Sequence, residues 1–361
     1  MPASVLIAGG GVGALETVLA LQALASDRVE LTLLAPGRHF VYRPLAVDEP
    51  FGGARVLRFP LREFAEDRGV RLVRDAVAAV EPSAREVRTQ GGARVPFDVL
   101  VLATGARALE AIPGALTFRG PSDVGRMRDL VDEVRAGAVA EIAFVVQPGA
   151  TWSLPLYELA FATAVAAREA GVPARLCVVT PERAPVEVLG PAASAEVTGL
   201  LEAHGIALQL TSTAIPVSAD RVVALPRLVG RRIAGVPADE RDFTPVDLFG
   251  RVRGVDRVYA VGDGTDCALK QGGLAAQQAD TAAASIAATF GALDVPAPFA
   301  PVVRGALLAD DIVRNLRSAG GGAPASVSDV APWSPGAKID GGRLAPYLAA
   351  HLLDAEVPAP A

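Results

Sequence analysis

The sequence is poor in the residues that build disulfide scaffolds and metal sites. Its 361 residues include only two cysteines, Cys177 and Cys267, which lie far apart and form no C-x-x-C motif. A short secreted scaffold or a zinc module would need more cysteines at closer spacing. We therefore expect a protein of a reducing compartment, with no disulfide framework and no metal site.

Long apolar runs and an excess of basic charge are also absent. No uninterrupted apolar run approaches the roughly 20 residues that span a bilayer. The N-terminal residues lack the charged region of a signal peptide. The formal net charge is −6, which argues against nucleic acid as the main partner. We expect a cytoplasmic protein whose contact with the inner face of the membrane is at most peripheral.

Aromatic residues are scarce as well, although the chain is apolar. Hydrophobic residues make up 51% of the sequence and aromatic residues only 5%, so alanine, valine and leucine supply most of the apolar mass. This composition is typical of a large α/β protein. The length predicts two or three domains rather than a single small core.

The stretch from Val5 to Glu16, VLIAGGGVGALE, predicts a strand, a tight turn and a helix. Gly9, Gly11 and Ala14 hold the three key positions of G-x-G-x-x-[GA], and Gly13 lies between the last two. In this motif the first glycine permits the turn, the second lets the backbone approach a pyrophosphate, and the third position lets helix and strand pack closely. The pattern predicts a dinucleotide site; the alternative is an ordinary βα turn.

The next segments complete a first nucleotide-binding unit. Glu30 to Leu34 is the predicted second strand, and Ala35 stands where NAD sites often carry a ribose-binding acid, which favours FAD over NAD here. The irregular stretch from His39 to Gly53 is either a surface loop or a loop over the cofactor that places Arg43 near phosphates or flavin. Residues 71–80 and 86–88 predict a pair of strands in a hairpin.

Two further buried strands end in small residues. The strand Asp98 to Leu102 runs into Thr104 and Gly105, where the backbone can approach a ligand or simply turn. The strand Arg257 to Val261 leads to Gly262 and Asp263. Lys270, Gln271, Gly272 and Gly273 follow, and a long alanine-rich helix covers residues 274–288.

A second strand–turn–helix unit lies between these two strands. Glu141 to Val146 is its first strand, a helix ends at Gly171, and residues 174–179, 191–204 and 205–210 predict strand, helix and strand. The last 60 or so residues predict a short β/α segment, PVVRGALLADDIVRNL, and a helix from Leu344 to Leu353. We expect the final residues, EVPAPA, to be disordered.

Three separated motifs, GGGVGALE, DVLVLATGA and VYAVGDGTD, stand in this order over roughly residues 3–300. Together they resemble the two-dinucleotide-binding-domain flavoproteins of the pyridine nucleotide-disulfide oxidoreductase fold, nearest the branch of type II NADH:quinone and sulfide:quinone oxidoreductases. The resemblance implies an α/β protein with two Rossmann-like domains, the second inserted in the first. The expected boundaries are 1–110 with 240–300 for the FAD domain, 111–239 for the second domain and 301–361 for a C-terminal segment.

The resemblance also implies FAD in the first domain and a set of binding residues. The pyrophosphate would lie on the first glycine turn, the ribityl hydroxyls would donate to Asp263, and the start of the last long helix would face the flavin. The residues implied in cofactor binding are Gly9, Gly11, Gly13, Ala14, Arg43, Thr104, Gly105, Gly262, Asp263, Gly272 and Gly273.

Two residues are candidates for catalysis. The chain holds only two lysines, Lys270 and Lys338. Lys270 precedes the last long helix, where an ammonium would raise the flavin potential or meet an anionic substrate oxygen; the alternative is a solvated helix end. Glu158 matches a family position near the flavin, where a carboxylate relays protons to a quinone or to N5; the alternative is a glutamate favoured by the helix dipole.

The second domain departs from the family pattern. Its glycine motif is replaced by QPGATWSLPLY, in which only Gly149 remains and Trp152 and Pro155 occupy the turn, so conventional NAD(P)H binding is doubtful. Cys177 lies in an apolar strand, and Cys267 is a lone thiol after the Gly-Asp motif. Sulfide oxidation through a pair of redox cysteines is therefore not expected.

The sequence predicts an FAD-dependent oxidoreductase that passes electrons from a two-electron donor through the flavin to a quinone or another small acceptor. The alternatives are an enzyme that oxidises a small substrate in the vacated nicotinamide pocket, and an FAD-binding protein without catalysis. The expected partners are a small-molecule donor and acceptor, and a second copy of the chain, since the C-terminal helix is better suited to dimer or core packing than to a membrane.

Overall fold

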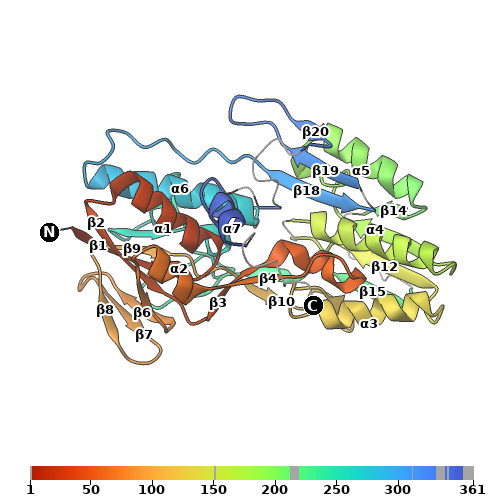
Figure 1. Ribbon diagram of the computed structural model, residues 1–361, viewed down its shortest axis with the longest axis horizontal. Coiled ribbons are helices and arrows are strands. Elements are labelled where there is room, and N and C mark those ends of the chain that lie inside the picture. The colour runs from red at the N-terminus through yellow and green to blue at the C-terminus, as the bar shows by residue number, and fades with distance from the viewer. Residues whose placement is uncertain are drawn as a thin grey trace, which may run out of the picture.

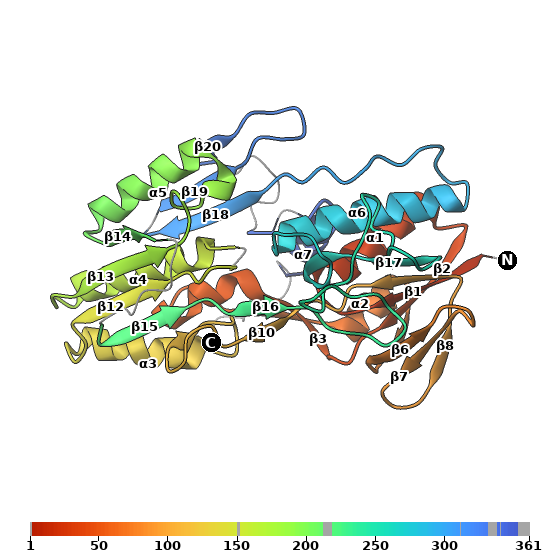
Figure 2. The ribbon, with the colours of Figure 1, turned by 180° about the vertical axis from the view of Figure 1, so that it is seen from behind.

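The structure is a computed structural model that describes residues 2–149, 152–211, 219–310, 312–330, 338–339 and 341–352. Two lobes lie side by side along the longest axis, each built on its own parallel five-stranded sheet (Figure 1). Two connecting strands and the C-terminal segment pass between the lobes (Figure 2).

The first lobe contains the N-terminal sheet, in the order β17-β9-β1-β2-β5, with neighbouring strands parallel. Its strands are β1 (Ala3–Ala8), β2 (Val29–Leu34), β5 (Arg71–Val73), β9 (Val99–Leu102) and β17 (Val258–Ala260). Side chains alternate between the two faces of each strand, so that Val5 and Ile7 join one core cluster while Leu6 and Ala8 join another.

Each face of this sheet has its own cover. One face packs against α1 (Val12–Ala25) and α6 (Gly272–Thr289), and the other against the antiparallel strands β6 (Val77–Glu81), β7 (Glu86–Thr89) and β8 (Arg94–Pro96). The strands β3 (His39–Tyr42) and β4 (Leu57–Pro60) and the helix α2 (Leu61–Asp67) complete the lobe. Between β3 and β4, the 3-10 helices η1 (Arg43–Val47) and η2 (Glu49–Phe51) reach the second lobe, where Ala46 and Val47 join its core.

The second lobe repeats the Rossmann-like arrangement. Its sheet runs β11-β15-β12-β13-β14 with parallel neighbours. Its elements are β11 (Leu116–Thr117), α3 (Val124–Arg135), β12 (Glu141–Val145), α4 (Leu154–Glu169), β13 (Arg175–Thr180), η3 (Glu187–Leu189), α5 (Pro191–Ala203), β14 (Ala207–Leu210) and β15 (Arg221–Ala224). The chain leaves the first sheet after β9 and returns to it at β17, so the second unit is inserted in the first.

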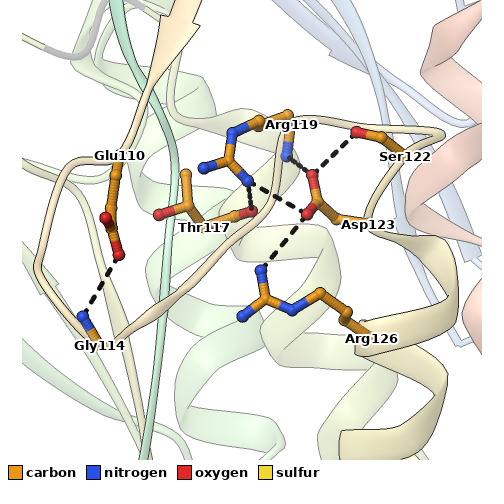
Figure 3. A network of polar contacts seen from close by, with 7 residues as sticks. All are labelled: Glu110, Gly114, Thr117, Arg119, Ser122, Asp123 and Arg126. Atoms are coloured by element: carbon orange, nitrogen blue, oxygen red, sulfur yellow. Dashed lines mark hydrogen bonds and ion pairs between the residues drawn. The ribbon is translucent and has the colours of Figure 1, made fainter.

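Two of the strands that connect the lobes pair with each other, and a polar network follows in the second lobe. β10 (Arg107–Leu109) and β16 (Arg227–Val229) pair as an antiparallel ribbon. Beyond it, the buried carboxylate of Asp123 accepts hydrogen bonds from the backbone and guanidinium of Arg119 and from Ser122, and forms an ion pair with Arg126 (Figure 3). This network fixes the turn at which α3 begins.

The C-terminal segment contacts both lobes. The strands β18 (Arg304–Ala309), β19 (Ile312–Arg317) and β20 (Ser326–Ser328) form an antiparallel sheet whose Leu307 and Leu316 join the core of the second lobe. The helix α7 (Leu344–Leu352) returns to the first lobe, where Tyr347 and Leu348 join its core (Figure 1). Among the described helices, none is long and apolar enough to cross a membrane.

The predicted α/β class with two Rossmann-like units is confirmed, two local predictions are wrong and a third is right only in part. The predicted hairpin of 71–80 with 86–88 is confirmed for β6, which pairs with β7, but Arg71–Val73 form the separate strand β5, which joins the parallel sheet beside β2. The segment 301–316 is a β-hairpin rather than a β/α unit, because Leu307 and Leu316 pack together onto the second lobe. Residues 39–53 contain β3 and two 3-10 helices, and the tail predicted to be disordered lies outside the described residues. The domain boundaries given above stay a proposal.

Candidate functional site

The carboxyl ends of three neighbouring strands, β1, β9 and β17, carry the predicted glycine-rich turns. Gly9 follows β1 with a φ of 144°, and a Cβ there would lie 2.1 Å from the carbonyl oxygen of Ala103, so only glycine fits. Gly11 caps α1 and faces free space, with no atom within 4 Å of a Cβ position. The positive end of α1 therefore opens onto free space, as a phosphate site requires.

Gly13 and Ala14 face the core instead. A Cβ at Gly13 would lie 3.1 Å from the side chain of Val261, and Ala14 is fully buried. Small residues at these positions let the first turn of α1 lie close to the ends of the strands. This is the packing role that the motif assigns to its third position.

The other two turns lie in contact. Thr104 and Gly105 follow β9, and Gly262 to Gly264 follow β17; a Cβ at Gly264 would lie 3.2 Å from the carbonyl oxygen of Gly105. The backbone N–H of Gly262 donates to Oε1 of Gln278 on α6 at 2.6 Å. The third turn is thereby fixed between the second turn and α6.

Asp263 is the acidic side chain of this group. Its carboxylate is half-buried, and no residue in the described ranges donates a hydrogen bond to it. Burial raises the pKa of Asp263, and the charges of Lys270 and Arg43 oppose that effect. A carboxylate without a donor of its own can accept hydrogen bonds from the hydroxyls of a ligand.

The two predicted cations differ in burial. Arg43 is exposed at the start of η1. Lys270 is buried, donates to the carbonyl oxygen of Thr265, and places Nζ 3.8 Å from the ring centroid of Phe243. Burial lowers the pKa of Lys270, and the charge of Asp263 raises it. Lys270 is thus held inside the lobe behind the Gly-Asp turn rather than solvated at a helix end.

The start of α6 is partly covered. Gln271 caps it, because Oε1 of its side chain accepts from the N–H of Leu274 at 2.9 Å. Gly273 lies against that side chain, and a Cβ at Gly272 would lie 2.9 Å from the side chain of Ile339. A residue of the C-terminal segment therefore lies over the helix end that the sequence predicts to face the flavin.

Glu158, the other catalytic candidate, is buried on α4. Its Oε1 accepts from the backbone N–H of Leu308 at 3.0 Å and from Nζ of Lys338 at 2.6 Å. The two side chains of this ion pair are only 5% and 10% exposed. Burial raises the pKa of Glu158, and the charge of Lys338 opposes it. Since Ile339 contacts Gly272, the pair lies next to the start of α6.

The sequence did not identify two polar groups, one beside Glu158 and one in the second lobe. Lys338, the partner of Glu158, stands 180 residues away in the sequence, and the scarcity of lysine was the signal that could have identified it. Glu182 follows β13 and accepts hydrogen bonds from three hydroxyl groups of the second lobe. It stands after the second strand of its unit, the position at which Rossmann sites often place a ribose-binding acid.

The residues of the first lobe fit FAD. The free space at Gly11 lies at a helix N-terminus, which suits a pyrophosphate. Asp263, which accepts no hydrogen bond from the described residues, suits ribityl hydroxyls, and the contact between Gly105 and Gly264 leaves bare backbone at the edge of the site. Trp152, in contrast, packs against the core of the second lobe rather than toward the first.

Comparison with known proteins identifies the same architecture. Residues 3–229 match the family model of pyridine nucleotide-disulphide oxidoreductases. The sulfide-quinone reductase of Aquifex aeolicus (strain VF5) is 27% identical over 116 residues, which cover 32% of this chain and 27% of that protein. The match therefore spans about a quarter of the curated relative.

Solved structures of similar fold extend the comparison over most of the chain. The sulfide:quinone oxidoreductase of Aquifex aeolicus superposes with a TM-score of 0.76 at 17% identity, covering 91% of this chain and 87% of that one. The NAD-dependent persulfide reductase of A. fulgidus superposes with a TM-score of 0.63 at 17% identity, covering 88% and 64%. At these identities the likeness establishes the fold.

Proposed function

The chain belongs to the pyridine nucleotide-disulphide oxidoreductase family of FAD-dependent oxidoreductases, and from that premise we propose that it passes electrons from a two-electron donor through FAD to a quinone or a similar small acceptor. The observation that carries the proposal is the meeting of three glycine-rich turns at one sheet edge, with free space at Gly11 and a carboxylate at Asp263 to which none of the described residues donates a hydrogen bond. A relative named for quinone reduction supports the acceptor.

We assign the binding roles from the geometry of the first lobe. The N-terminus of α1 with Gly9, Gly11, Gly13 and Ala14 would hold the pyrophosphate, and Asp263 would accept from the ribityl hydroxyls. Thr104, Gly105 and Gly262 would lie along the same edge, and Arg43 would add positive charge above it. The start of α6 at Gly272 and Gly273 would face the flavin ring. Bound FAD would supply the reversible two-electron chemistry.

Two buried groups would handle charge near the ring. Lys270 lies behind Asp263, where its ammonium adds a fixed positive charge to a region of low dielectric constant. Glu158 and Lys338 form a buried pair beside the start of α6, and either member could hold a proton that accompanies electrons to the acceptor. The chemistry needed at a quinone oxygen is proton donation, which both groups can perform.

The cysteines do not provide an internal dithiol. Cys177 is on β13 in the second lobe and Cys267 follows the Gly-Asp turn of the first; both are free thiols. A donor that needs a pair of redox cysteines of this chain is therefore not part of the proposal.

Purification of the chain followed by visible absorption spectroscopy tests the proposal. We expect a bound flavin spectrum, its loss in Gly11→Trp and Asp263→Ala variants that still fold by circular dichroism, and reoxidation of the chemically reduced protein by a soluble quinone. Full flavin occupancy in both variants would refute the site. Flavin that is not reoxidised by any quinone would refute the acceptor and leave the cofactor assignment intact.

A further inference from the structure

The second lobe keeps the frame of a dinucleotide site, but its own side chains fill the place of the ligand. In this frame a pyrophosphate lies at the N-terminus of the helix after the first strand, here α4, and the adenosine ribose is bound by an acid after the second strand, here β13. Ser153 at the start of α4 and Glu182 after β13 stand at these two positions.

The ribose-binding position is occupied internally. Glu182 stands two residues after β13, and its carboxylate accepts from Ser153 Oγ at 2.8 Å, Tyr157 Oη at 2.9 Å and Thr180 Oγ1 at 2.9 Å. Burial raises the pKa of Glu182, and these three hydroxyls oppose that effect. A ribose hydroxyl would have to displace donors that already satisfy the carboxylate.

The phosphate-binding position carries an anion of the protein. Ser153 is the N-cap of α4 and Tyr157 lies in its first turns, so the hydrogen bonds hold the Glu182 carboxylate at the positive end of this helix. A pyrophosphate placed there would meet a like charge in a partly buried site, which raises the cost of binding.

The C-terminal sheet covers the remaining approach to α4. A Cβ at Gly305 of β18 would lie 2.7 Å from the side chain of Leu154 and 3.2 Å from the ring of Trp152. Three residues further along β18, the backbone N–H of Leu308 donates to Glu158. β18 therefore lies directly on the first turns of α4, and the absence of a side chain at residue 305 is what allows this contact.

We infer that the second lobe is a sealed dinucleotide-binding domain, in which Glu182, Trp152 and the strand β18 replace a nicotinamide dinucleotide, so that the electron donor is not NADH or NADPH bound in this lobe. The inference rests on the proposed function, since it specifies the class of donor that the FAD enzyme excludes. The remaining donors are molecules that contain no nucleotide and that reach the FAD site of the first lobe directly.

Titration of the purified full-length protein with NADH and with NADPH tests the inference. We expect no saturable heat by isothermal titration calorimetry and no bleaching of the visible flavin band under anaerobic conditions, whereas dithionite bleaches the band completely. Saturable binding of either nucleotide would overturn the inference. The absence of any flavin band would refute the FAD assignment instead. The titration is then repeated on the Gly11→Trp variant, whose first-lobe site is blocked, and saturable heat there would overturn the inference.

A pair of variants tests the internal anion. In the Glu182→Gln variant, the three hydroxyl donors share a single acceptor oxygen. We therefore expect a lower midpoint temperature of thermal unfolding than for the wild type. Glu187→Gln is the matched control, because Glu187 is an exposed glutamate of the same connection. Equal midpoints for the two variants would show that Glu182 does not act as the anion of α4 and would overturn the inference.

Discussion

Protonation of Glu16 should control how firmly the C-terminal helix is held. Glu16 is fully buried on α1, and its two oxygens accept from the backbone N–H groups of Arg343 at 2.8 Å and Leu344 at 2.9 Å, at the start of α7. Burial and the nearby charge of Asp280 raise the pKa of Glu16 from 4.5 to about 7. The guanidinium of Arg343 contacts Asp280 and partly offsets that charge.

The sign of the pH effect follows from this raised pKa. The folded state binds a proton on Glu16 more tightly than the unfolded chain, so the contribution of Glu16 to stability is greatest below pH 4.5, falls as the pH rises to about 7 and is constant above that. Each unit of pKa change corresponds to about 1.4 kcal/mol, so the folding stability lost between these two pH values is about 3 kcal/mol. Asp280 titrates in the same direction, because burial also raises its pKa.

The Glu16→Gln variant isolates this contribution. Glutamine resembles the protonated side chain, with one acceptor oxygen and one donor, so the variant and the wild type should have similar unfolding free energies near pH 5. Near pH 8 the variant avoids the buried charge but loses one charge-assisted hydrogen bond, which is worth about 1.5 to 3 kcal/mol. We expect the difference between the two proteins to shift in favour of the variant by up to about 3 kcal/mol between these pH values.

Urea unfolding at the two pH values measures the shift, and hydrogen exchange at the amides of Arg343 and Leu344 localises it. Glu169→Gln is the control, because Glu169 is exposed at the end of α4. If the variant and the wild type keep a constant difference at both pH values, Glu16 is not the titrating group and the explanation fails. Unchanged exchange of the two amides would show that the carboxylate does not hold α7.

Three further predictions concern the site. Lys338→Met leaves the buried carboxyl group of Glu158 without its cationic partner and should destabilise the protein by up to about 3 to 5 kcal/mol in urea unfolding, with recovery when Glu158→Gln is added. Gly9→Ala should prevent folding, because its Cβ would overlap backbone and its φ is 144°, whereas Gly11→Ala should fold and retain less flavin, as circular dichroism and absorbance will show. Asp263→Asn should lose flavin, while the apoprotein of this variant should be more stable at neutral pH. Burial raises the pKa of this carboxyl group, so a neutral side chain removes the cost of burying its charge. Lower stability of the variant would contradict this account.

Local patterns predicted the parts of the fold that depend on neighbours in the sequence. The glycine turn from Gly9 to Ala14 specifies its own geometry, because a positive φ and close packing are needed within six residues. The continuous apolar strands, such as Val99 to Leu102, are typical of parallel sheets buried on both faces. The order of such segments along the chain predicted the two Rossmann-like units.

The partners of the buried polar groups could not be predicted in this way. Glu158 bonds to residues 308 and 338, and Glu16 to residues 343 and 344, so each pairing joins segments at least 150 residues apart. Nothing in the local pattern around Glu158 distinguishes a solvated helix start from a buried ion pair. The hairpin at residues 304–317 was misread for the same reason, since its strands are stabilised by packing on α4.

The sealed second lobe also explains why two glutamates near the start of α4, Glu182 after β13 and the buried Glu158 on α4, have different partners. Around the start of α4, Ser153 and Tyr157 orient Glu182 as an internal anion, and one residue later Glu158 turns toward Leu308 and Lys338. A bound dinucleotide would compete with the first arrangement and with the strand β18 that supplies the second. Without a bound nucleotide, the second lobe holds the Glu158–Lys338 pair beside the start of α6, and the start of α6 in turn lies at the proposed flavin site.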